Sequence, residues 1–154
     1  MINKIYFSIL ISILGLSYFI SVPAQIEPGR PVVILLTPES IYAGTLDSDL
    51  PDYESASIEG LFNNATYGIF DNEFALEITL QGIFYNGLNI RPEEQMLILA
   101  IPPGNSRDAW LQIVSILFDR FNVPELYIHE TDTWEHAITP ELTPGEKLYW
   151  IARD

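Results

Sequence analysis

Apolar residues recur in this chain with two different spacings, which predict strands and helices in alternation. Continuous apolar runs predict buried strands at 32–36, 96–101 and 126–129. Between them, apolar side chains recur every three or four residues, and this spacing predicts helices over about 72–86 and 106–121. Strands that alternate with helices are typical of an α/β domain with parallel strands at the centre of its sheet.

Both predicted helices have recognisable ends. Asp71 or Asn72 can cap the first helix, and Gly87 is suited to the left-handed position that follows its last turn. Ser106 can cap the second helix, and Pro124 prevents that helix from continuing. The first helix is predicted to bury one stripe, formed by Leu76, Leu80, Ile83 and Phe84. The second is predicted to bury a broader face, formed by Trp110, Ile113, Val114, Leu117, Phe118 and Phe121.

Shorter segments complete the predicted sheet. Residues 41–46 can return beside the first strand as a hairpin, 55–58 can add a short strand, and 147–152 can form the last one. We therefore expect an α/β fold with a mixed sheet of about five strands flanked by helices.

Residues 1–24 have the pattern of a secretory signal peptide. Lys4 supplies the positive start, residues 5–20 are mostly apolar, and Val22 and Ala24 place small side chains where a signal peptidase would cut. Such a signal would direct the chain into the secretory pathway or out of the cell, with cleavage before Gln25.

The alternative is an N-terminal membrane anchor formed by residues 5–22, because the apolar run approaches the length that spans a bilayer. In either case one domain, residues 25–154, remains. Membrane contact is expected only through an uncleaved N-terminal segment.

The composition narrows the choice of partners. The chain has 21 acidic and 7 basic residues and a net charge of −14, so nucleic acid and anionic membrane surfaces would repel it. Cysteine is absent, so no disulfide supports the fold. Asn64 begins a glycosylation sequon, which matters only in a eukaryotic secretory route.

The stretch from Ile83 to Ile128 resembles part of the actin family, in the lobe called subdomain 1. The matching pieces occur in the same order and at nearly the same spacing: Phe84-Tyr85-Asn86, Pro92-Glu93-Glu94, Pro103, Phe121-Asn122-Val123-Pro124 and Tyr127. A weaker match covers residues 32–60. The resemblance implies that residues 25–154 form a single actin-like, ribonuclease-H-like lobe from which subdomain 2 is deleted near residues 60–67.

The same resemblance implies that the actin ATPase machinery is lost. The glycine-rich phosphate turn of the family falls on a degenerate turn that includes Thr37, Glu39 and Ser40, where Pro38 removes one N–H group. The family's water-positioning glutamine falls on Thr131. We therefore expect no cofactor and no catalytic residue in an actin-related protein with a structural or protein-binding role. An ATP-binding protein completed by a partner or by self-assembly is the alternative.

Two other chemistries have weaker support. His129 and His136 stand near three carboxylates and are possible metal ligands, although their spacing matches no common zinc site. The pair Glu93 and Glu94 is compatible with a secreted hydrolase that uses carboxylates. In both cases a solvated polar surface is the simpler interpretation.

A lobe that stands alone exposes apolar area, and such a patch usually marks a binding face. Tyr85, Tyr127, Tyr149 and Trp150 are candidates to line that face. We therefore expect either a protein partner or self-association.

Overall fold

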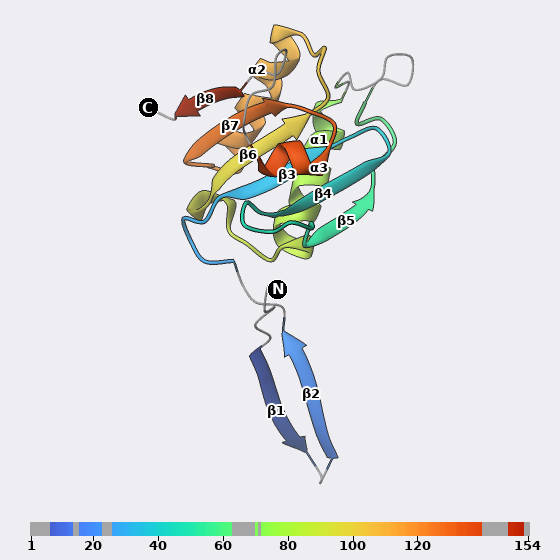
Figure 1. Ribbon diagram of the computed structural model, residues 1–154, viewed down its shortest axis with the longest axis vertical. Coiled ribbons are helices and arrows are strands. Elements are labelled where there is room, and N and C mark those ends of the chain that lie inside the picture. The colour runs from blue at the N-terminus through green and yellow to red at the C-terminus, as the bar shows by residue number, and fades with distance from the viewer. Residues whose placement is uncertain are drawn as a thin grey trace.

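The computed structural model describes residues 7–13, 16–22, 26–62, 70, 72–139 and 148–152, and for the first two strands and the last one it describes the backbone. Strands β1 (Phe7–Ile13) and β2 (Leu16–Val22) pair antiparallel in a two-stranded sheet of their own (Figure 1). This hairpin covers most of the apolar segment that we interpret as a secretory signal. The predicted cleavage site lies outside the described residues. No helix in the described ranges is long and apolar enough to cross a membrane.

A six-stranded mixed sheet forms the centre of the domain, in the order β5-β4-β3-β6-β7-β8. The parallel strands β3, β6 and β7 occupy the middle, and β4, β5 and β8 run antiparallel to their neighbours. The α/β class and the mixed sheet are confirmed, with one strand more than the expected five. The strands are β3 (Val32–Leu36), β4 (Ser40–Thr45), β5 (Tyr53–Ala56), β6 (Met96–Ile101), β7 (Glu125–Glu130) and β8 (Leu148–Ala152).

Strands β3 and β6 are apolar at every position, because both faces of the sheet are covered there. Every residue of β3 is buried, and β6 is buried from its second residue onward. In the parallel register Val32 lies beside Leu97, which lies beside Leu126, so these side chains point to the same face. Continuous apolar runs are expected of strands in such positions.

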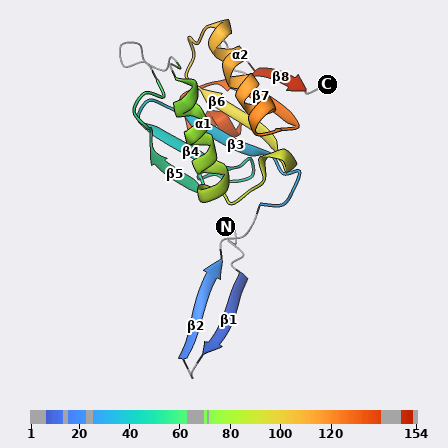
Figure 2. The ribbon, with the colours of Figure 1, turned by 180° about the vertical axis from the view of Figure 1, so that it is seen from behind.

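Two long helical segments cover one face of the sheet (Figure 2). The first consists of α1 (Glu73–Gln81) and a π-helical continuation, η1 (Gly82–Gly87). The second consists of α2 (Arg107–Ser115) and the π-helical η3 (Ile116–Arg120). The predicted caps are confirmed: Asn72 Oδ1 accepts hydrogen bonds from the N–H groups of Phe74 (2.9 Å) and Ala75 (3.1 Å). Ser106 Oγ accepts one from the Ala109 N–H at 3.2 Å.

Both segments end in the same way, and this ending differs from the predicted one. Asn89 and Asn122 adopt the left-handed conformation, with φ of 51° and 53°. The Ile90 N–H after Asn89 donates back to the Phe84 carbonyl at 2.8 Å. The prediction that Gly87 supplies the left-handed residue is wrong, because the π-helical turn carries the chain two residues further before it reverses. Asparagine tolerates this conformation better than other residues with a side chain.

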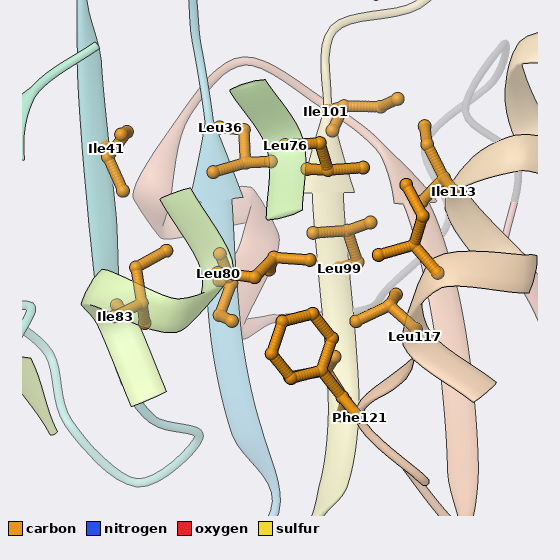
Figure 3. Close-up of a cluster of buried hydrophobic side chains, with 14 of the residues drawn as sticks. Leu36, Ile41, Leu76, Leu80, Ile83, Leu99, Ile101, Ile113, Leu117 and Phe121 are labelled. Atoms are coloured by element: carbon orange, nitrogen blue, oxygen red, sulfur yellow. The ribbon is translucent and has the colours of Figure 1, made fainter. Parts of the chain in front are cut away.

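The main core lies between these helices and the sheet (Figure 3). All four residues of the predicted stripe on the first helix are buried, and Phe84 meets Phe121 edge-to-face with ring centroids 5.2 Å apart. On the second helix Ile113, Leu117 and Phe121 are buried, while the other three residues of the predicted face are partly buried against the core. The packing therefore joins both helices to one another as well as to the sheet.

A short helix, α3 (Trp134–Ile138), packs on the opposite face over β3 (Figure 1). Trp134 and Ala137 are buried there against the side chains of β3 and β6 that point to this second face, which are Val33, Leu35, Ile98 and Ala100. The interpretation of residues 129–136 as a solvated polar segment is wrong for His129, Thr131 and Trp134, which are buried. It holds for Asp132, Glu135 and His136, which are exposed. Polar residues dominate the sequence of this segment. The apolar residues Trp134 and Ala137 lie on the side of α3 that packs against the sheet.

Residues around the proposed deletion are tied together by backbone and side-chain contacts. Phe62 and Phe70 form an isolated antiparallel bridge, which brings together the two ends of the intervening segment. The Phe70 N–H also donates to Asn105 Oδ1 at 2.7 Å, which links it to the loop after β6. Residues 63–69, which include Asn64 and most of the predicted deletion point, lie outside the described residues.

Candidate functional site

The turn between β3 and β4 occupies the position of the phosphate loop in the actin resemblance, and it is closed by its own hydrogen bonds. The Thr37 N–H donates to the Ser40 carbonyl at 2.9 Å, and the Ser40 N–H donates to Thr37 Oγ1 at 3.0 Å. The Thr37 hydroxyl donates to the same Ser40 carbonyl at 2.9 Å. Phosphate loops instead aim several N–H groups at the ligand. Here the N–H groups of Thr37 and Ser40 satisfy acceptors within the turn.

Thr131, at the position of the water-positioning glutamine in the resemblance, is also engaged with neighbouring backbone. Its N–H donates to the Ile101 carbonyl at 2.9 Å, and its hydroxyl accepts from the Thr133 N–H at 3.4 Å. The side chain is buried. It therefore helps to shape the loop that connects β7 to α3.

The two candidate metal ligands have different surroundings. His129 lies in β7, beside Ala100 in the neighbouring strand, and its side chain is fully buried. His136 is exposed on α3. Within the described part of the chain, no group of three or more His, Asp or Glu side chains is arranged to hold a metal ion.

The paired carboxylates of Glu93 and Glu94 lie at η2 (Pro92–Glu94), before β6. Both are bound to one cation: Arg91 Nε is 3.3 Å from Glu93, and Arg91 Nη1 is 2.7 Å from Glu94. All three side chains are substantially exposed. This arrangement is a surface ion cluster that ties the loop to the start of η2.

The aromatic residues selected from the sequence divide between the interior and the surface. Tyr85 is 52% exposed on η1, whereas Tyr127 is partly buried on β7. The Tyr127 hydroxyl donates to Glu125 Oε1 at 3.0 Å, and this hydrogen bond raises the pKa of Tyr127 above its ordinary value of 10.0. Partial burial and the charge of Glu125 act in the same direction. Tyr149 and Trp150 lie in β8, where only the backbone is described.

An apolar stripe on the outer face of the first helical segment is the most unusual surface feature. Phe74 is 69% exposed and Ile78 is 44% exposed, and Tyr85 follows further along the segment. We call these three residues the α1 stripe. Buried Leu76 and Leu80 show that the opposite side of the same helix faces the core. Exposed large apolar side chains that share one helix are more informative than scattered ones.

A groove runs beside this stripe, between α1 and the end of the second helical segment. We call it the α1–η3 groove; it is open to solvent and has a volume of about 600 Å³. Three of the side chains that line it are charged, namely Glu73, Glu77 and Arg120. The others are apolar or neutral polar: Asn72, Phe74, Ile78 and Gln81. Two members of the α1 stripe therefore form part of the groove.

Among the described residues that line the groove, two acidic side chains contact a single cation, Arg120. Arg120 Nη1 is 3.1 Å from Glu77, and Arg120 Nη2 is 3.7 Å from Glu73. The Glu77 side chain is the most buried of the three, at 22% exposed. Two carboxylates against one guanidinium leave the groove with a negative charge, in keeping with the −14 of the whole chain.

The sequence-based selection missed Phe74 and Ile78. The available signal was their spacing: they are four residues apart and lie off the stripe of Leu76 and Leu80, so the first helix has apolar residues on two sides. Arg120 could not be assigned to the same surface from spacing, since it belongs to another helix. The sequence was also compared with models of known protein families, and none of them matches it.

Proposed function

We propose that this chain is a non-catalytic protein-binding module, built on a single lobe related to subdomain 1 of actin. The observation that carries the proposal is the α1 stripe, which presents Phe74, Ile78 and Tyr85 to solvent on one helical segment. Burying such side chains against a partner is favourable by roughly 25 cal/mol per Å² of apolar surface. A protein partner is the natural source of a complementary apolar surface.

The arrangement of the sheet supports the actin-like part of the proposal. A three-stranded antiparallel meander, β3-β4-β5, is followed by α1, the parallel strand β6, α2 and the parallel strand β7. This is the order that the resemblance implies for the matched segments. The bridge between Phe62 and Phe70 joins the two ends of the short segment that stands where the resemblance implies subdomain 2.

The internal hydrogen bonds of Thr37 and Ser40 support the non-catalytic part. Isothermal titration of the full chain with Mg-ATP tests it, and we expect no binding heat up to millimolar nucleotide. Micromolar affinity would overturn the non-catalytic assignment. Nucleotide-dependent protection of the turn in hydrogen exchange would locate the site at Thr37 to Ser40.

The binding role is tested with variants of the stripe. The full chain, a Phe74→Ser/Ile78→Ser variant and a Leu50→Ser variant are each immobilised and cross-linked to proteins of the source cell. Leu50 is a matched control, since it is 76% exposed but lies in the loop between β4 and β5. We expect the unmodified chain and the Leu50→Ser variant to retain the same set of partners. The Phe74→Ser/Ile78→Ser variant should lose them. Identical retention by all three would contradict the proposal.

We also propose that residues 1–24 direct the chain into the secretory pathway. Expression of the full chain in a secreting host, followed by N-terminal sequencing of the product, tests this. We expect a chain that begins at Gln25. Recovery of an intact N-terminus in the membrane fraction would favour the anchor formed by residues 5–22.

A further inference from the structure

We infer that the α1–η3 groove binds a cationic amphipathic helix of a partner protein. The inference rests on the proposed protein-binding function and names the chemistry of the partner. The groove offers an apolar strip flanked by carboxylates, and a helix with apolar side chains on one face and Lys or Arg beside them is its complement.

The shape of the site favours a helix. Phe74 and Ile78 are four residues apart on α1, so they form a ridge that runs nearly along the helix axis. Arg120, at the end of η3, borders the other side. A groove between two neighbouring helices can accept the side-chain ridge of a third helix. Recognition of this kind uses apolar anchors at positions i, i+3, i+4 and i+7 of the bound helix.

The charge of the site selects a cation-bearing partner. Glu73 and Glu77 line the groove, and α1 has no basic residue. Arg120 is already engaged by both carboxylates, so an incoming Lys or Arg can compete for them. Complementary charge guides the encounter, while the apolar contacts supply most of the affinity.

The same charge argues against other occupants. A second copy of this chain would bring another net charge of −14 to an acidic face. Nucleic acid and anionic membranes carry the same sign of charge and would be repelled for the same reason. A separate protein segment that combines apolar and basic residues meets both requirements of the groove.

The direct test uses a fluorescent 18-residue peptide of Leu and Lys, with Leu at helical i, i+3, i+4 and i+7 spacing, titrated with the full chain. One control peptide has the same composition in scrambled order. The other keeps the order but has Glu in place of Lys. We expect the helical Leu/Lys peptide to bind at least about tenfold more tightly than either control, because only it combines an apolar face with positive charge. Equal binding of the scrambled peptide would overturn the inference.

Variants of the full chain locate the binding. Phe74→Ser/Ile78→Ser should weaken the helical peptide at least about tenfold, because it removes the apolar ridge, whereas Leu50→Ser should leave binding unchanged. Arg120→Gln should tighten binding severalfold, because it releases Glu73 and Glu77 to the peptide. Circular dichroism of each variant verifies that the fold is retained. Unchanged binding by the double variant, or weaker binding by Arg120→Gln, would contradict the assigned site.

The outcomes separate this inference from the proposed function. If a cellular partner depends on Phe74 and Ile78 but the Leu/Lys peptide binds no better than its controls, the partner chemistry is wrong and the binding role stands. If neither the partner nor the peptide depends on the stripe, both are overturned.

Discussion

At Gly87 the ring of Tyr53 leaves no room for a side chain. A Cβ atom there would lie 2.6 Å from Tyr53 Cδ2, well inside contact distance. Gly87 thus allows η1 to approach β5, and backbone conformation is not the reason for this glycine. Gly82 lies in the same helical segment, yet a Cβ added to it would meet nothing within 4 Å.

We predict opposite effects of alanine at these two glycines. Gly87→Ala should lower the free energy of unfolding by about 1–3 kcal/mol, because the Tyr53 ring must shift. Gly82→Ala should raise it by about 0.4–1 kcal/mol, because helical φ and ψ suit alanine and the unfolded chain loses freedom. Urea unfolding of both variants measures the difference. Equal effects of the two substitutions would show that Tyr53 does not constrain η1.

Tyr127 provides a titration test of its contact with Glu125. Because the pKa of Tyr127 is raised in the folded protein, its contribution to stability is present below pH 10 and is lost as the pH rises through the folded-state pKa. We expect Glu125→Gln to lower the pKa of Tyr127, because the charged hydrogen-bond acceptor is removed. NMR titration of ring-labelled tyrosines measures both values. An unchanged pKa in Glu125→Gln would contradict the assigned cause.

At the scale of elements, the two long helical segments form a matched pair. Each starts at a polar cap, Asn72 or Ser106, and each ends in a π-helical turn followed by a left-handed asparagine. Their caps and buried stripes could be predicted from the sequence, since both depend on residues within the same segment. The π-helical ends could not, because apolar spacing alone does not distinguish a widened last turn from an α-helical one.

The contact between Phe84 and Phe121 should couple these segments energetically. We predict that each Phe→Leu variant lowers the free energy of unfolding by about 1–2 kcal/mol. The double variant should deviate from additivity by about 0.5–1.5 kcal/mol, because the edge-to-face ring pair is lost in either single variant.

The two single variants and the double variant form a double-mutant cycle. A second cycle, with Phe84→Leu and Trp134→Phe, is its matched control. Trp134 lies on the opposite face of the sheet, so these two effects should add to within about 0.5 kcal/mol. Additive behaviour of the Phe84/Phe121 pair would show that the ring contact carries no coupling.

At the scale of the whole molecule, the excess of acidic residues acts on both stability and recognition. A net charge of −14 on 154 residues produces self-repulsion in the compact state. The same excess favours the cationic partner that we propose for the α1–η3 groove. Composition alone predicts this charge, but the meeting of Glu73 and Glu77 with Arg120 depends on how the helices pack.

We predict that salt stabilises the full chain at neutral pH. Raising NaCl from about 20 mM to about 300 mM should increase the free energy of unfolding by on the order of 1 kcal/mol, because repulsion between surface carboxylates is screened. Near the sequence pI of about 4.2 the effect should disappear, because the net charge is close to zero. Thermal unfolding at both pH values measures it, and an equal salt effect at both would exclude charge repulsion as the cause.

The sequence by itself determined the α/β class, the buried central strands, the caps at Asn72 and Ser106, and the acidity of the surface. These features depend on each residue's own chemistry and on neighbours within a few positions. Only the tertiary structure decided the burial of His129, the closure of the second sheet face by α3, and the groove that brings Arg120 to Glu73 and Glu77. Those features depend on contacts between segments far apart in the chain. Local periodicity and composition do not show which distant segments will meet.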